Sequence, residues 1–197
     1  MAQQTTIGDV GICNEVLIGL GARPIASFNE NTDGALACSN VFATVRDDLL
    51  AQHDWPCAVK RVELSPLAQA PAFGYAYLFP LPGDCIRVQG VSSLGRFGEP
   101  VLDYRLESGN ILCNQNPIGL YYVWRNDVLS SWPAGMISLF KYRLRWALAY
   151  AITRDSALES ACEATYARQL MLYKGRVSQE QPAEDLQGGD FEYARYR

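Results

Sequence analysis

The spacing of apolar residues follows a helical period near both ends of the chain and changes in the middle. Near the N-terminus, apolar residues recur at spacings of three and four, as they do on one face of an α-helix. These residues are Val10, Cys13, Leu17 and Leu20. Gly21 follows them and is a suitable residue to end the helix.

A second helix is predicted to begin after Thr32, which is a suitable N-cap residue. Its apolar face comprises Cys38, Val41, Phe42, Val45 and Leu49. Pro56 is expected to end this helix, because the residue before a proline avoids the helical conformation.

Between Cys57 and Ser131 prolines and glycines are frequent, and the apolar residues occur in short runs of β type. The segments AVKRVEL and CIRVQGV alternate apolar and polar residues, and NILCN and LYYVW are further strand candidates. This part of the chain is therefore predicted to form a small, mostly antiparallel sheet.

The helical period returns from about Ala134 to Thr153, with apolar residues on two faces, which is typical of a helix packed between partners. One face comprises Ile137, Phe140, Leu144, Leu148 and Ala151, and the other comprises Leu139, Trp146 and Tyr150.

A last helix is predicted to open with a capping box, Ser156 with Glu159, and to end at Gly175. Its apolar face comprises Leu158, Cys162, Tyr166 and Leu170. Since only a tight turn around Asp155 separates it from the preceding helix, the two should pack antiparallel.

These patterns together predict an α+β fold. Residues 1–56 and 133–177 form an antiparallel helical bundle, residues 57–132 form an inserted β domain, and residues 178–197 form an extended C-terminal arm.

The composition restricts the class of protein but indicates no particular chemistry. The chain has 197 residues, of which 49% are hydrophobic and 19% charged, as in ordinary globular proteins. No apolar run is long enough to span a bilayer, and the N-terminal residues do not resemble a secretory signal, so we expect no membrane partner. The six cysteines are scattered and are expected to be free thiols in a cytosol-like compartment.

Charge argues against a protein that reads duplex DNA. The net charge is −4, whereas proteins that bind duplex DNA usually carry a basic patch. The nearest approach to one is KYRLR, in which Lys141, Arg143 and Arg145 share a predicted helix, and a solvated helix face explains these residues equally well.

The candidate catalytic and metal-binding residues are few. His53 is the single histidine, so a zinc site would lack ligands. Asp47 and Asp48 are adjacent and diverge by about 100° on a helix, so they cannot act as a facing pair. Asn29 to Asn40 resembles a calcium loop in which both end positions lack their carboxylates, so a turn before the second helix is the simpler interpretation.

No cofactor, metal or enzymatic activity is therefore expected, and binding or assembly becomes the predicted type of function. Two classes remain open: a structural adaptor, and a soluble regulatory module that binds a ligand in the β domain or a partner, without catalysis.

Several stretches in the same order resemble the head-to-tail adaptor proteins of tailed phages, that is, the tail tubular protein A family of short-tailed phages and its relatives. They include the helix that ends in LGARPI, the segment WPCAVKRVEL that leaves the second helix, and the strand segment PGDCIRV. The resemblance covers about residues 10–56, 57–92 and 133–181.

This resemblance implies a virion protein at the head–tail junction, assembled in the host cytoplasm. It implies a homo-oligomeric ring, about twelve copies in the family, that docks under the portal protein and joins it to the tail nozzle protein. Genomic DNA would pass through the lumen without being read, which fits the negative net charge.

The C-terminal end of the chain is expected to be the arm that binds the portal. Its aromatic residues and arginines follow a polar spacer, and such side chains commonly anchor interfaces. The predicted portal-binding residues are Phe191, Tyr193, Arg195, Tyr196 and Arg197.

Overall fold

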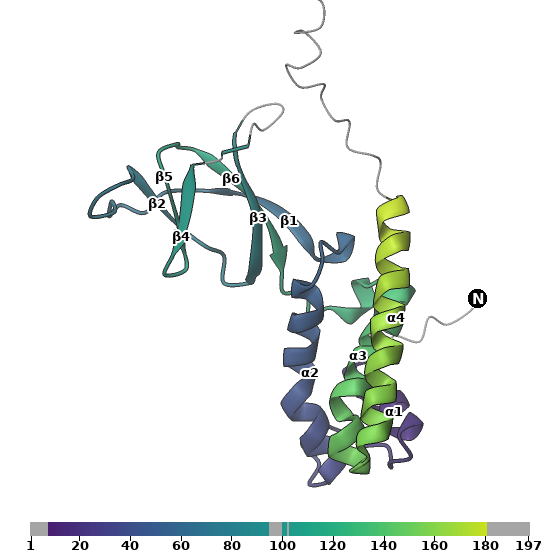
Figure 1. The fold of residues 1–197 in the computed structure, drawn as a ribbon. Coiled ribbons are helices and arrows are strands. Elements are labelled where there is room, and N and C mark those ends of the chain that lie inside the picture. The colour runs from purple at the N-terminus through teal and green to yellow at the C-terminus, as the bar shows by residue number, and fades with distance from the viewer. Residues whose placement is uncertain (1–7, 95–99, 102, 181–197) are drawn as a thin grey trace, which may run out of the picture.

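The computed structural model describes residues 8–94, 100–101 and 103–180. Within these residues the chain has an α+β fold, in which four α-helices form a bundle and two small antiparallel sheets project from one end of it (Figure 1). The helices are α1 (Asp9–Gly19), α2 (Asp33–Ala51), α3 (Ala134–Thr153) and α4 (Ser156–Glu180). The strands between α2 and α3 are β1 (Val59–Leu64), β2 (Tyr77–Pro80), β3 (Cys85–Ser93), β4 (Tyr104–Glu107), β5 (Asn110–Cys113) and β6 (Ile118–Trp124). Two short 3-10 helices, η1 (Pro56–Ala58) and η2 (Leu129–Ser131), connect the bundle to the strands.

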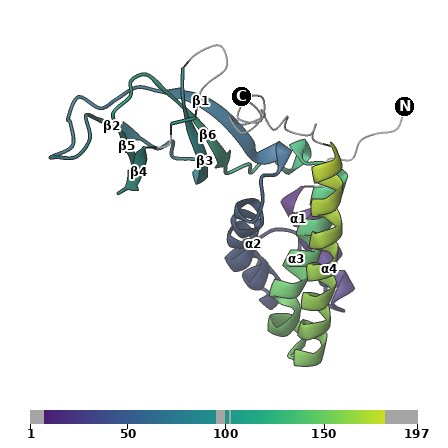
Figure 2. The ribbon, with the colours of Figure 1, turned by 45° about the horizontal axis from the view of Figure 1, so that its top comes forward.

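The bundle packs in the way that the helical periods predicted. Its core comprises residues of all four helices, among them Leu17, Phe42, Leu144, Leu148 and Cys162. Phe42 of α2 meets Phe140 of α3 edge to face, with ring centroids 5.2 Å apart. Figures 1 and 2 show α2 and α4 on either side of α3. The helices from the two ends of the chain therefore share one core.

The ends of α1 and α2 agree with the sequence. The Oγ1 atom of Thr32 accepts a hydrogen bond from the backbone N–H of Ala35 and caps α2. Gly21, with φ +80°, follows the C-cap of α1 in a conformation that favours glycine. Helix α2 ends at Ala51, before Pro56, so the residues that follow it leave the helix as expected.

The start of α4 differs from the prediction. Asp155 caps this helix, because its Oδ1 atom accepts hydrogen bonds from the backbone N–H groups of Ala157 and Leu158 at 2.8 and 3.2 Å. Ser156 is the first residue of the helix, so the proposed capping box was wrong. Arg154, in the left-handed conformation at φ 57°, ends α3 and leaves Asp155 free to cap.

The end of α4 also differs, because Gly175 lies inside the helix, which continues to Glu180. Tyr173 packs on Trp55 with ring centroids 5.4 Å apart, and Val177 is buried in the bundle core. These contacts outweigh the cost of about 1 kcal/mol that a glycine imposes inside a helix. Residues 178–180, expected in an extended arm, are therefore helical.

The burial of some apolar residues of α3 is lower than predicted. Leu139 and Leu148 are fully packed, but Trp146 is only partly buried, and Tyr150 and Ala151 are exposed. Both predicted faces are therefore less fully covered near the C-terminal end of α3, where Tyr150 and Ala151 lie.

The middle of the chain forms two three-stranded antiparallel sheets instead of the single sheet predicted. Their strand orders are β1-β6-β3 and β2-β5-β4. The two sheets face one another across a second core, which includes Leu64, Phe79, Val91, Ile111 and Leu120. The bundle and the sheets thus have separate cores, and Val123 of β6 joins the bundle core.

All six cysteines are free thiols, as expected from the sequence. Cys13 and Cys38 are buried in the bundle core and hydrogen-bonded to each other, and this contact, together with burial, raises the pKa of Cys13. Cys162 lies in the same core, whereas Cys113 lies in the core between the sheets. Burial also raises the pKa of Cys57 to about 11. Cys13 and Cys57 are consequently poor nucleophiles at neutral pH.

Candidate partner-binding surfaces

The predicted portal-binding residues Phe191, Tyr193, Arg195, Tyr196 and Arg197 lie outside the described residues. The last described residue, Glu180, lies at the end of the bundle from which the sheets project (Figure 1). The structure therefore shows where the chain leaves the bundle before the arm, and the arm itself stays a prediction.

His53 sits just after α2 and serves in packing. Its ring meets Trp55 edge to face, with centroids 4.8 Å apart. Burial, followed by the charge of Lys174, lowers the pKa of His53, so the imidazole is neutral at pH 7. The adjacent Asp54 forms an ion pair with Arg87 instead of orienting the imidazole.

The two adjacent aspartates of α2 make different ion pairs. Asp47 Oδ2 lies 2.7 Å from Nε of Arg125 at the end of β6, and Asp48 lies 3.6 Å from Arg143 of α3. No group of three or more potential metal ligands occurs among the described residues. In the segment that resembled a calcium loop, Asp33 begins α2 directly after the Thr32 cap.

Ion pairs hold the β1-β6-β3 sheet to the bundle and to itself. Asp47 and Asp54, at the C-terminal end of α2, pair with Arg125 and Arg87 of the sheet side. Within the sheet, Asp84 accepts hydrogen bonds from Lys60 Nζ at 3.0 Å and from the Tyr122 hydroxyl at 3.1 Å. Charged side chains therefore join the C-terminal end of α2 to the sheet side.

The pKa values of Asp84 and Tyr122 reflect these contacts. Burial alone would raise the pKa of Asp84, but the hydrogen bonds from Lys60 and Tyr122 and the Lys60 charge outweigh it and lower the pKa. Burial and the Asp84 carboxylate raise the pKa of Tyr122 to about 12. The carboxylate is charged and the phenol is protonated at neutral pH, so the cluster is structural.

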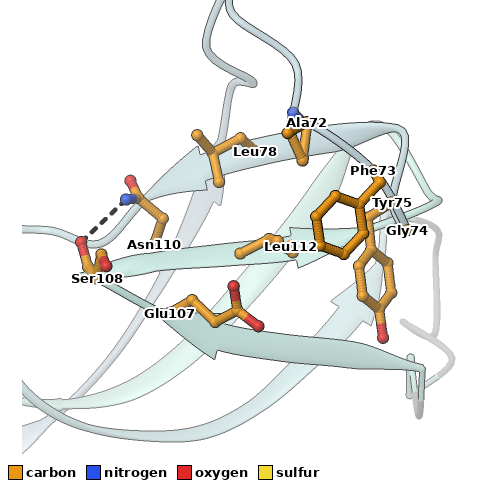
Figure 3. A pocket seen from close by; sticks show the side chains of 10 residues that line it. Ala72, Phe73, Gly74, Tyr75, Leu78, Glu107, Ser108, Asn110 and Leu112 are labelled. Carbon is orange, nitrogen blue, oxygen red and sulfur yellow. Dashed lines mark hydrogen bonds between the residues drawn. The ribbon is translucent and has the colours of Figure 1, made fainter.

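A hollow of about 380 Å³ opens on the β2-β5-β4 sheet (Figure 3). Leu78 and Leu112 form its floor, and they belong to the outer face, because the neighbouring Phe79 and Ile111 point into the core between the sheets. The loop from Pro71 to Tyr75 forms the wall. The hollow is thus a feature of the far end of the molecule, away from the bundle.

The chemistry of this hollow favours a protein surface over a small-molecule site. Phe73, which is 88% exposed, lies on its rim, and Glu107 is the one charged residue in its lining. The side-chain amide of Asn110 is already bonded to the carbonyl of Ser108 at 3.0 Å. None of the buried, unpartnered side-chain polar atoms of the described chain lines it. A ligand site would instead present several polar groups that converge on the ligand.

The surface of the hollow was not predicted from the sequence, although a local signal for one part of it is present. The turn between β4 and β5 is Ser108-Gly109, with φ 49° and 74°, and a two-residue turn with glycine is a strong hairpin signal. By contrast, the ion pairs of Asp47, Asp54 and Asp84 join residues far apart in the chain, and no local signal reveals them.

Comparison with protein-family models and with curated proteins gives no match for this sequence. None of the described helices combines the length and apolar character that crossing a membrane requires.

Proposed function

We propose that this chain is a structural virion protein, a head-to-tail adaptor that forms a ring under the portal and joins it to the tail nozzle. The observation that carries the proposal is the two-part architecture. The bundle and the sheets have separate cores, meet at one end, and each expose apolar side chains. Met171 of α4 is 77% exposed and Phe73 of the sheet loop is 88% exposed.

A connecting protein needs at least two contact surfaces that act independently, and exposed apolar side chains commonly mark such surfaces. The resemblance of the sequence to phage adaptors supports the assignment of partners. In this proposal the portal binds the arm residues Phe191, Tyr193, Arg195, Tyr196 and Arg197, and the nozzle binds the sheets. The ion pairs of Asp47 and Asp54 join the two parts at the end of α2.

The protein would act at the head–tail junction after assembly in the host cytoplasm, as a ring of about twelve copies. Genomic DNA would pass through the lumen of the ring. The net charge of −4 supports passage without binding, because duplex DNA adheres to basic surfaces.

The proposal can be tested with the full chain and a chain that lacks residues 188–197, each mixed with portal rings from the same virus. Negative-stain microscopy should show the full chain as a second ring on the portal. Loss of the aromatic anchors should weaken binding by about 2 kcal/mol or more, that is, at least about thirtyfold in affinity. Equal binding of both chains would reject the arm, and no binding of the full chain would reject the adaptor function.

The truncation should leave the fold intact, since α4 and both cores lie before residue 188. Unchanged thermal unfolding of the truncated chain is the control. If the truncated chain unfolded at a lower temperature, weaker binding would reflect damage to the fold.

The alternative function is that of a soluble regulatory module that binds a ligand or partner without catalysis. The hollow beside Phe73 is the observation in its favour. A module of this kind would stay monomeric or dimeric in the presence of portal rings, and Phe73→Ala would abolish its ligand binding. A ring on the portal that persists in Phe73→Ala would exclude it.

A further inference from the structure

Each described sheet has two edge strands, and only some of these edges are covered. At the edge of β2, the backbone N–H of Leu67 donates a 2.7 Å hydrogen bond to the carbonyl of Leu78. At the edge of β3, the N–H of Val101 donates to the carbonyl of Val91 at 2.8 Å. The outer edges of β1 and β4 have no strand partner among the described residues. Such an edge presents unpaired N–H and C=O groups to which another strand can bind.

The free edge of β4 presents the backbone groups of Leu106. The turn that joins β4 to β5, Ser108-Gly109, has positive φ at both residues, as in a type I′ turn. In a turn of this kind the flanking residues, here Glu107 and Asn110, form a hydrogen-bonded pair. Along an antiparallel ladder such pairs alternate with pairs whose backbone groups point away from the partner strand. The N–H and C=O of Leu106 therefore point toward the free edge.

The side chains of β4 divide into an apolar inner side and a charged outer side. Leu106 pairs with Ile111, which is fully buried between the sheets, but Leu106 itself is 50% exposed. Arg105 and Glu107 are exposed on the opposite face of the sheet, which they share with Leu112 (Figure 3). Neither of these two charged residues forms an ion pair within the described part of the chain. The free edge thus combines an uncovered apolar side chain with two unpaired charges of opposite sign.

This arrangement makes β4 complementary to a second copy of itself. When two β4 strands pair antiparallel around Leu106, this residue lies opposite its counterpart, and Arg105 of each copy lies opposite Glu107 of the other. Both charge pairs are then opposite in sign, and opposite charges across neighbouring strands stabilise a sheet. On the inner side the two half-exposed leucines cover each other. Edges that are protected against pairing commonly carry lysine or proline, and β4 contains neither.

We propose that two copies of this chain join through β4, so that their β2-β5-β4 sheets continue as one antiparallel sheet. The contact is isologous, because both copies use the same surface, and it stops at two copies. The contacts within a ring are heterologous, so this inference goes beyond the proposed function and does not depend on it. Since β4 has only four residues, the interface is small, and the dimer should be weak and form at high subunit concentration.

The other free edge, that of β1, has the same order of side chains but suits this contact less. Its residues are Arg61-Val62-Glu63. The guanidinium carbon of Arg61 lies 4.9 Å from the centroid of the Tyr121 ring, so Arg61 already has a partner within the subunit. Val62 is 37% exposed, which is less than Leu106. In addition, β1 follows η1 at the end of the bundle, whereas β4 belongs to the sheet farther from the bundle (Figures 1 and 2). A second copy therefore has freer access to β4.

The test reverses one charge of the proposed pair at a time in the full chain. Arg105→Glu makes the residues of both cross-strand pairs acidic, and Glu107→Arg makes them basic. Each variant alone should therefore dimerise at least about tenfold more weakly than the wild type. When the two variants are mixed in equal amounts, they should form a heterodimer as stable as the wild-type dimer, because each acidic edge then meets a basic edge.

The control variant is Arg168→Glu, which makes the same change at an exposed position of α4 where the described chain has no ion pair. It should dimerise like the wild type. Sedimentation velocity over a range of subunit concentrations measures dimerisation, and thermal unfolding should confirm that all variants fold like the wild type. Hydrogen exchange adds a measure of backbone pairing. The amide of Leu106 should exchange more slowly as the concentration of the wild type rises, and should exchange at the rate of the monomer in Arg105→Glu.

Three results would overturn the inference. They are a wild type that stays monomeric up to about 1 mM, single variants that dimerise like the wild type, and mixed variants that stay monomeric when the wild type dimerises. Dimerisation that is lost in Arg61→Glu but kept in Arg105→Glu would assign the contact to β1 and reject β4. The proposed function is judged separately, with portal rings. A chain that binds portal rings without dimerising would keep the adaptor and reject this contact, and a chain that dimerises but ignores portal rings would do the reverse.

Discussion

Trp55 is the residue through which α2, η1 and the upper part of α4 are held together. Its side chain is 1% exposed, its Nε1–H donates a 2.7 Å hydrogen bond to the carbonyl of Leu49, and its ring packs on Tyr173. Replacing it should therefore destabilise the fold and loosen the last turns of α4 in particular. We compare Trp55→Ala, which removes all of these interactions, with Trp55→Phe, which keeps most of the ring.

The size of each effect follows from the interactions that the substitution removes. Truncating a buried Trp side chain costs about 3–5 kcal/mol. This cost includes the lost burial of apolar surface and the cavity that remains, because α2 and α4 can close that cavity only in part. The carbonyl of Leu49 also accepts from the backbone N–H of Gln52 at 3.3 Å, so it keeps a partner when the indole is gone. In Trp55→Phe the loss of the hydrogen bond therefore costs only about 0.5–1.5 kcal/mol. With the smaller ring, the total loss in the free energy of unfolding should be about 1–3 kcal/mol.

Urea unfolding followed by circular dichroism measures these changes in the free energy of unfolding. For a chain of this length, about 1 kcal/mol shifts the melting temperature by about 2–4 °C, so Trp55→Ala should melt about 6–20 °C below the wild type. Hydrogen exchange should be faster in the segment from Tyr173 to Glu180 than at the start of α4. A destabilisation below about 1 kcal/mol in Trp55→Ala would refute the placement of this side chain in the core.

Three further predictions test the fold by the same unfolding measurements. Leu148→Ala should cost about 2–5 kcal/mol, because Leu148 is fully buried in the bundle core. Gly135→Ala should destabilise the fold, because a Cβ atom at this position would lie 2.5 Å from the ring of Tyr173. Gly175→Ala should stabilise the fold by about 1 kcal/mol, because no atom lies near the added Cβ and alanine favours the helix. The free energy of unfolding should fall as the pH rises from about 10 to about 12, because the unfolded chain loses the proton of Tyr122 near its ordinary pKa of 10 while the folded chain keeps it.

Each of these three predictions would be contradicted by a specific result. A cost below about 1 kcal/mol for Leu148→Ala would mean that α3 is rotated. Equal effects of the two glycine substitutions would contradict the contact with Tyr173. Stability that is unchanged between pH 10 and pH 12, or that has the same slope in Tyr122→Phe, would show that Tyr122 has no perturbed pKa.

The sequence predicted the helices well because the residues that each helix buries recur at helical spacing. The range of α3, Ala134–Thr153, agreed with the structure, and so did the Thr32 cap, since both depend on residues close together in the chain. The end of α4 was predicted wrongly because Gly175 is a local signal, whereas Tyr173 and Val177 hold the helix through contacts with distant residues.

The surfaces were harder to predict than the cores. Ser138, Tyr142 and Arg145 look unremarkable in the sequence, and the hollows that they line arise only where α1 and α4 border α3. Phe73 lies in a loop without periodicity, so its exposure required the structure of the two sheets. The arm residues were proposed from composition and from the family resemblance, and they stay a prediction.

The free cysteines can report local opening of the two cores. Cys13 and Cys38 are fully buried in the bundle core and Cys113 in the core between the sheets, so a thiol reagent can reach each of them only when the surrounding core opens. The labelling rate of each thiol, resolved by mass spectrometry, then records how often its core exposes it. Equal rates in the two cores would mean that the bundle and the sheets open as a single cooperative unit. Unequal rates would mean that one core can open locally while the other stays folded.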